Sequence, residues 1–86
     1  MNQKERKQRE VIFKKLVIEN IRYYRQLKGI TQAELAEKVD VSHEFIRSLE
    51  SLSGKNTFSA YTLWRISQAL NVSLDALCYF KKNNVL

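Results

Sequence analysis

Apolar residues recur along the chain at the three- and four-residue spacing of helices, and no segment alternates as a strand does. Across residues 16–27 the apolar positions Val17, Ile21 and Tyr24 lie on one helical face, and Gly29 stands where such a helix would end. The chain has two glycines and no proline, so few residues interrupt helices. We therefore expect an all-α fold whose first helix covers residues 16–27.

Two shorter helices follow, each preceded by a residue suited to capping. Thr31 and Glu34 have the spacing of a capping box, which predicts a second helix over residues 32–38. Ser42 is a good N-cap for a third helix. Apolar side chains would hold these helices together, and the small Ala36 lies where they would cross; the apolar set is Leu35, Val39, Val41, Ile46 and Leu49.

The rest of the chain predicts a loop and two further helices. Residues 51–58 concentrate Ser, Gly, Asn and Thr, as loops do. Ser59 would cap a fourth helix with an inner stripe of Leu63, Ile66 and Leu70, and Ser73 a short fifth helix in which Leu74, Leu77 and Phe80 pack. We expect a five-helix domain over residues 16–80, preceded by an extension (1–15) and followed by a tail (81–86).

Composition limits the size and setting of the protein. Eighty-six residues, 44% of them apolar, suffice for one core and one domain. The single cysteine, Cys78, cannot form an intramolecular disulfide, which favours a reducing, cytoplasmic setting. No apolar run has the length of a signal peptide core or a membrane span. We expect no membrane partner.

The charge distribution favours a polyanionic partner. The formal net charge is +6, from 15 Lys and Arg and 9 Asp and Glu. Residues 1–28 hold nine of the basic residues and three of the acidic ones, so the first third of the chain carries the whole surplus. Such an asymmetry is typical of contact with nucleic acid or an anionic surface.

Residues 32–51, QAELAEKVDVSHEFIRSLES, resemble the helix-turn-helix of the phage repressor and Cro-like (Xre) family, and the likeness extends over residues 16–80. It rests on Gln32, Ala36, Ser42 and Glu50 at their places in the two helices, and on the later run TLWRISQALNVSLDAL. The resemblance implies a five-helix lambda-repressor-like domain that binds double-stranded DNA, with a recognition helix over residues 42–51 in the major groove.

The same resemblance implies roles for individual residues. Base-reading positions of the family fall at His43, Glu44 and Ser48, and we expect the same recognition helix to present Arg47 to base edges as well. Phosphate-contacting positions of the family fall at Gln32 and Ser51, and we expect Lys55 in the following loop to contact phosphate too. A buried ion pair would join Arg25 in the first helix to Glu50 at the end of the third.

Two departures from the family pattern affect these expectations. The turn between the second and third helices has Asp40 where the family usually has Gly, and Asp is among the few other residues that visit the left-handed backbone region. The chain also has an insertion of about two residues between Glu50 and Gly54, in the loop from which the family makes backbone contacts to phosphate.

Catalysis and metal binding have little support in the sequence. His43 is the only histidine and Cys78 the only thiol, so no His or Cys cluster can form. We expect no enzyme activity, metal, cofactor or small-molecule substrate. The main alternative is a protein-interaction module, antitoxin-like or adaptor-like, because residues 31–51 hold two basic residues against five acidic ones and would repel phosphate.

Two questions about assembly stay open in the sequence. The N-terminal basic segment fits an arm that tracks DNA, an extension of the first helix used in dimer packing, or a solvated tail. A homodimer on a palindromic site is expected because one short helix contacts few base pairs. Its interface would use apolar residues of the last helix and tail, namely Leu77, Tyr79, Phe80, Val85 and Leu86.

Overall fold

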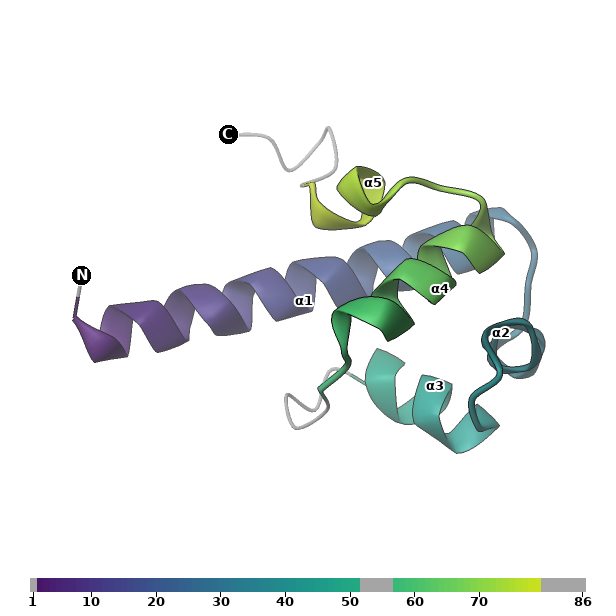
Figure 1. The fold of residues 1–86 in the computed structure, drawn as a ribbon, viewed down its shortest axis with the longest axis horizontal. Helices are drawn as coiled ribbons and strands as arrows, with labels where there is room; N and C mark the ends of the chain where they lie inside the picture. The colour runs from purple at the N-terminus through teal and green to yellow at the C-terminus, as the bar shows by residue number, and fades with distance from the viewer. Residues whose placement is uncertain (1, 52–56, 80–86) are drawn as a thin grey trace.

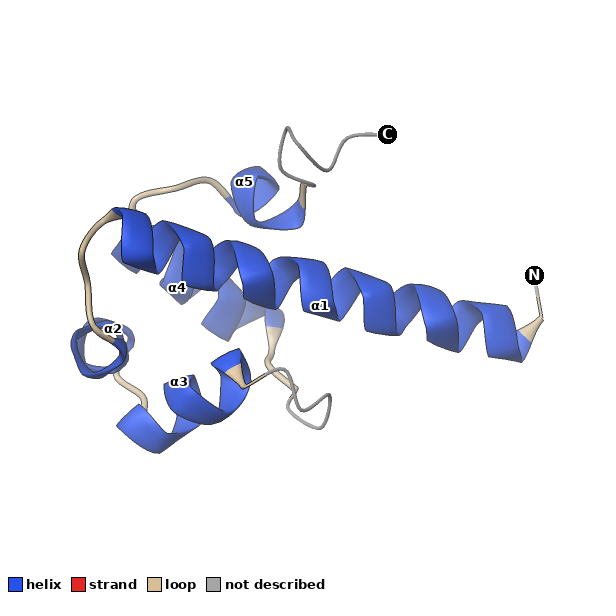
Figure 2. Ribbon diagram, turned by 180° about the vertical axis from the view of Figure 1, so that it is seen from behind, coloured by secondary structure: helices blue, strands red, loops and turns tan. Residues whose placement is uncertain are grey.

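The computed structural model describes residues 2–51 and 57–79, and this part of the chain is all-helical. Its helices are α1 (Gln3–Leu27), α2 (Gln32–Val39), α3 (His43–Glu50), α4 (Ala60–Leu70) and α5 (Leu74–Cys78). The shorter helices gather around the C-terminal half of α1, while its N-terminal half projects beyond them (Figures 1 and 2). The predicted all-α, five-helix fold is confirmed.

A single core lies between the C-terminal half of α1 and the other helices. Every helix contributes an apolar side chain with essentially no exposure, because one stripe of each faces inward. The most deeply buried apolar side chains are Val17, Ile21, Leu35, Val39, Ile46, Leu49, Ile66, Leu70 and Leu77. Burying each contributes roughly 1.5–3 kcal/mol. Ala36 is buried in the same cluster, as its small side chain predicted.

Side-chain caps fix where the four shorter helices begin. Thr31, Ser42, Ser59 and Ser73 each accept a hydrogen bond from the backbone N–H three residues later, as the sequence predicted. At Thr31 the capping box is complete, since the Glu34 carboxylate accepts from the Thr31 N–H at 2.8 Å. This hydrogen bond lowers the pKa of Glu34.

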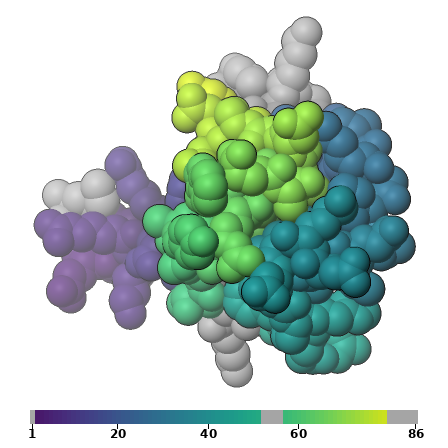
Figure 3. Space-filling model, turned by 45° about the vertical axis from the view of Figure 1, so that its right-hand side comes forward, coloured from purple at the N-terminus to yellow at the C-terminus, as the bar shows by residue number. Residues whose placement is uncertain are grey.

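The first helix begins at Gln3, and the prediction that it begins at Leu16 is wrong. Residues 3–15 contain no Gly or Pro and are mostly Gln, Lys, Glu and Arg, which favour helix without any apolar stripe. Asn2 caps the helix by accepting from the Glu5 N–H at 2.8 Å. The first buried residue of the helix is nevertheless Leu16, and its first turns project beyond the remaining domain (Figure 3).

The turn between α2 and α3 depends on a left-handed residue. Asp40 has φ 63° and ψ 49° and ends α2, as expected for the position where the family usually has Gly. Its N–H donates to the Glu37 carbonyl at 3.2 Å, and its exposed carboxylate lies 4.0 Å from the Arg65 guanidinium. Asn71 ends α4 in the same conformation, with φ 56°.

The expectations for the C-terminal region are partly wrong. Leu74 is 38% exposed and does not pack as predicted. Leu77 is completely buried in the core of the monomer, so it is not available to a dimer interface. Tyr79 is 67% exposed. The predictions for Lys55, Phe80, Val85 and Leu86 fall outside the described residues.

Replacing Asp40 tests the strain at this turn. We expect Asp40→Gly to be at least as stable as the wild type, because Gly adopts a positive φ without steric cost. Asp40→Ala should be less stable than Asp40→Gly by about 1–2 kcal/mol. For a domain of this size that difference corresponds to a shift in melting temperature of about 4–15 °C in thermal denaturation. An Ala variant that melts above the Gly variant would contradict a strained left-handed turn.

Candidate nucleic-acid interface

Helix α3 has one face in the core and one in solvent. Ile46 and Leu49 are completely buried, whereas His43, Glu44 and Arg47 on the other side are exposed. Ser48 is half-buried at the border between the two faces. Figure 1 shows α3 at the outer edge of the molecule, beside α2 and on the side of α4 away from α5. The predicted base-reading residues therefore share one accessible helix surface.

A buried ion pair fixes α3 to α1. The Nε of Arg25 donates to Oε2 of Glu50 at 2.7 Å, and Nη2 donates to Oε1 at 2.9 Å, so the contact is bidentate. The two side chains are only 11% and 2% exposed. Nη1 of Arg25 also donates to the Ile30 carbonyl at 2.8 Å. The pair that the sequence resemblance implied is thus present between these two helices.

Gln32 joins this pair from α2. Its Nε2 donates to Oε1 of Glu50 at 3.0 Å, which brings the first residue of α2 to the C-terminal end of α3. Ser51 lies at the same end, where its hydroxyl donates to the Ser48 carbonyl at 2.6 Å. Two of the three predicted phosphate-contacting residues are therefore neighbours of the ion pair, at the opposite end of α3 from His43. The third, Lys55, is outside the described residues.

Most acidic residues of the helix-turn-helix have local partners. Three of them pair with a guanidinium group: Glu50 with Arg25, Glu44 with Arg47, and Asp40 with Arg65. The Glu34 carboxylate accepts a hydrogen bond from the Thr31 N–H. The excess of acidic residues over residues 31–51 therefore overstates the repulsion that a phosphate would meet. The Glu44–Arg47 pair is more than half exposed, and such surface pairs contribute about 1 kcal/mol or less.

Two further residues, Phe45 and Asn20, have contacts that indicate a structural role. Phe45 is half-buried and packs against the core, which favours a packing role over contact with DNA. Asn20, which the sequence analysis missed, is 1% exposed, and its Nδ2 donates to the carbonyls of Leu77 at 2.9 Å and Tyr79 at 2.6 Å. Its Oδ1 has no hydrogen-bond partner. A polar residue between Val17 and Tyr24 on the inner stripe was the available signal.

Residues 2–51 and 57–79 contain no candidate metal site and no candidate membrane-spanning helix. Within these ranges no three His, Cys, Asp or Glu side chains are grouped as metal ligands would be. None of the described helices combines the length and apolarity needed to cross a bilayer.

A capped helix, a tight left-handed turn and a second helix with one exposed polar face define a helix-turn-helix domain, the class used by DNA-binding transcription regulators. The chain belongs to the Xre-like helix-turn-helix family, since the family model described as "Helix-turn-helix" matches residues 21–77. The fold is similar to the crystal structure of a hypothetical transcription factor, NHTF, from Neisseria. That comparison has a TM-score of 0.74 and 20% identity, and covers 83% of this chain and 79% of the other. No curated protein sequence matches the chain.

Removing the Glu50 carboxylate tests the ion pair. We expect Glu50→Ala to lose about 3–5 kcal/mol of unfolding free energy, because the Arg25 guanidinium would stay buried without its counter-ion. Replacing Arg25 and Glu50 together by apolar residues of similar volume should recover most of the loss. The matched control is Glu44→Ala, which removes an exposed pair and should cost less than about 1 kcal/mol. A melting temperature of Glu50→Ala equal to that of the control would contradict the structural role.

Proposed function

We propose that the protein is a sequence-specific DNA-binding transcription regulator that places α3 in the major groove. The observation that carries this proposal is the division of α3 into a buried apolar face and an exposed polar face at the edge of the domain. A helix of this kind fits the major groove, whose base edges offer a distinct pattern of donors and acceptors for each base pair. The family match supports the same class of function.

Each exposed side chain of α3 has a chemistry suited to base edges. Arg47 can donate two hydrogen bonds to guanine O6 and N7, and Glu44 can accept from cytosine N4. These two residues now pair with each other, and the weak exposed pair can exchange for contacts with bases. His43 and Ser48 can donate or accept. Gln32 and Ser51 would bind phosphate at the C-terminal end of α3.

We further propose a homodimer acting in the cytoplasm, where a regulator has access to DNA. A two-fold arrangement doubles the number of base pairs contacted and matches a palindromic site. Because Leu77 is buried in the monomer, Tyr79 is the described residue of the original C-terminal set that stays accessible to a partner.

A protein-interaction module is the second candidate function, and one surface favours it. Tyr61 and Trp64 on α4 are 64% and 45% exposed, and their rings stack with centroids 6.1 Å apart. The Arg65 guanidinium lies 5.5 Å from the centre of the Tyr61 ring. Tyr, Trp and Arg are the residues that most often dominate binding energy in protein interfaces.

Selection of bound duplexes from a random pool tests DNA binding and identifies the site. On the selected site, alanine at His43, Glu44 or Ser48 should each cost about 1–3 kcal/mol, because a direct base contact is lost. Affinity for random DNA should barely change. Trp64→Ala is the control and should leave both affinities unchanged. Equal losses on selected and random DNA for all three variants would contradict the assignment, and failure to enrich any sequence would favour the protein-interaction module.

Sedimentation of the protein with its selected DNA tests the homodimer. We expect two chains per duplex and half-sites about one helical turn apart, with centres about 34 Å from each other. Tyr79→Ala should weaken the dimer more than Tyr61→Ala, an equally exposed tyrosine on α4. One chain per duplex on a site without two-fold symmetry would contradict this part of the proposal.

A further inference from the structure

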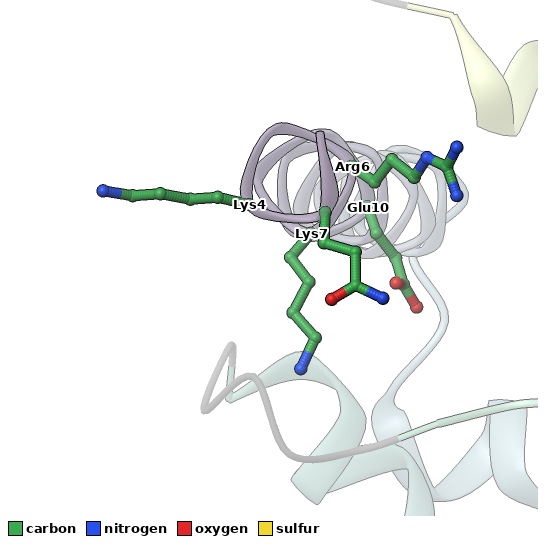
Figure 4. A pocket seen from close by; sticks show the side chains of 5 residues that line it. Lys4, Arg6, Lys7 and Glu10 are labelled. Atoms are coloured by element: carbon green, nitrogen blue, oxygen red, sulfur yellow. The ribbon is translucent and has the colours of Figure 1, made fainter. Parts of the chain in front are cut away.

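The projecting half of α1 continues the helix that carries Arg25, so each of its residues has a defined direction relative to α3. Lys7 precedes Arg25 by eighteen residues, which is about five full turns of an α-helix. The two residues therefore lie on the same face of α1, and Arg25 is the residue that binds Glu50 of α3. Figure 4, a view along α1, shows Lys7 pointing towards the side where α3 lies, while Arg6 points away from it.

Four positive charges of the extension form two pairs that point to different sides of the helix. Lys4 and Lys7 are three residues apart and point about 60° from each other, with Lys7 directed towards α3 and Lys4 to one side of it (Figure 4). Gln3, Arg6 and Glu10 line the same shallow hollow as these two lysines. Arg6 and Arg9 are also three residues apart, and their mean direction lies about 160° around the helix from that of Lys4 and Lys7, while Arg6 itself is about 100° from Lys7. All four side chains belong to exposed residues. The chain therefore offers two matched pairs of charges that differ in direction.

The rise of the helix sets how far these charges reach when the extension is folded. The helix is capped by Asn2, and the Lys14 ammonium lies 3.1 Å from the Glu10 carboxylate one turn away. Glu10, Phe13 and Lys14 line a hollow together with Thr57 and Phe58, the residues that lead into α4. Lys7 lies about 10 Å beyond Lys14 along the axis and Lys4 about 15 Å, at a rise of about 1.5 Å per residue.

The positive charge of residues 2–15 favours a DNA duplex over a second copy of the chain as the partner of this helix. Residues 2–15 hold six Lys and Arg and two Glu, so a second copy of the extension would bring a like charge against it. Its exposed apolar residues Val11, Ile12 and Phe13 are consecutive and point about 100° apart, so they form no single apolar face for another helix. A DNA duplex brings one negative charge for about every 1.7 Å of its axis.

We propose that the Lys4–Lys7 face of α1 binds the phosphate backbone of the same duplex that α3 contacts, while the Arg6–Arg9 face does not. Along a duplex parallel to α1, the roughly 10–15 Å from Lys14 to Lys7 and Lys4 would span about three to four base pairs. This inference rests on the proposed DNA-binding function and assigns it a second, sequence-independent contact.

Two double variants separate the faces, namely Lys4→Gln with Lys7→Gln and Arg6→Gln with Arg9→Gln. Each removes two positive charges, and Gln has nearly the helix propensity of Lys and Arg. The slope of log affinity against log salt should flatten by up to about 1.8 for the Lys4/Lys7 variant, or about 0.9 per phosphate contact. Between 50 and 200 mM salt the wild type would then lose about 12-fold more affinity than this variant. The Arg6/Arg9 variant should keep the wild-type slope.

A shortened duplex supplies the second measurement. Trimming about four base pairs from the flanks of the selected site should remove the difference between the wild type and the Lys4/Lys7 variant. If the salt slope flattens equally for both variants, the assignment to one face is wrong. If it flattens for neither variant, the extension contacts solvent and not DNA. The α3 alanine variants keep this test separate from the proposed function, since they lose sequence preference and retain the salt slope. A wild-type chain without affinity for DNA would overturn both proposals.

Discussion

The arrangement of the domain depends on the bidentate contact between Arg25 and Glu50. Moving either charge out of water costs several kcal/mol, so the pair persists only where hydrogen bonds satisfy its remaining atoms. Gln32 and the Ile30 carbonyl supply those bonds, so that α1, α2 and the chain between them all meet at the end of α3. The apolar core provides most of the stability, whereas this contact fixes the direction in which the exposed face of α3 points.

Much of the fold could be predicted because its signals are local. A serine or threonine that caps a helix acts within three residues, and the left-handed turn at Asp40 depends on one backbone position. The buried positions of α2, α3 and α4 follow from helical periodicity alone. The start of α1 was not predictable in this way, because residues 3–15 form a helix through propensity and capping and contact no core that would impose a stripe.

The candidate site was predicted less completely, because its geometry is tertiary. The resemblance supplied Arg25 and Glu50 as partners and the exposed face of α3, but it assigned Gln32 to phosphate and gave no sign that its amide binds Glu50. Pairing of Glu44 with Arg47 follows helix spacing and was accessible to sequence reasoning. The side of α1 on which Lys7 lies required the length and phase of the whole helix, which the shorter predicted helix did not contain.

The length of α1 also divides the molecule into regions of different protection. Its C-terminal half has backbone amides that open only when the core opens, whereas residues 3–13 can fray from Asn2 inward without exposing the core. A free helix of this length would be marginal in water, but here the folded half supplies the nucleus. Hydrogen exchange along this one helix should therefore slow steadily from its first turn to Leu16, and helical content should fall with temperature before the domain itself melts.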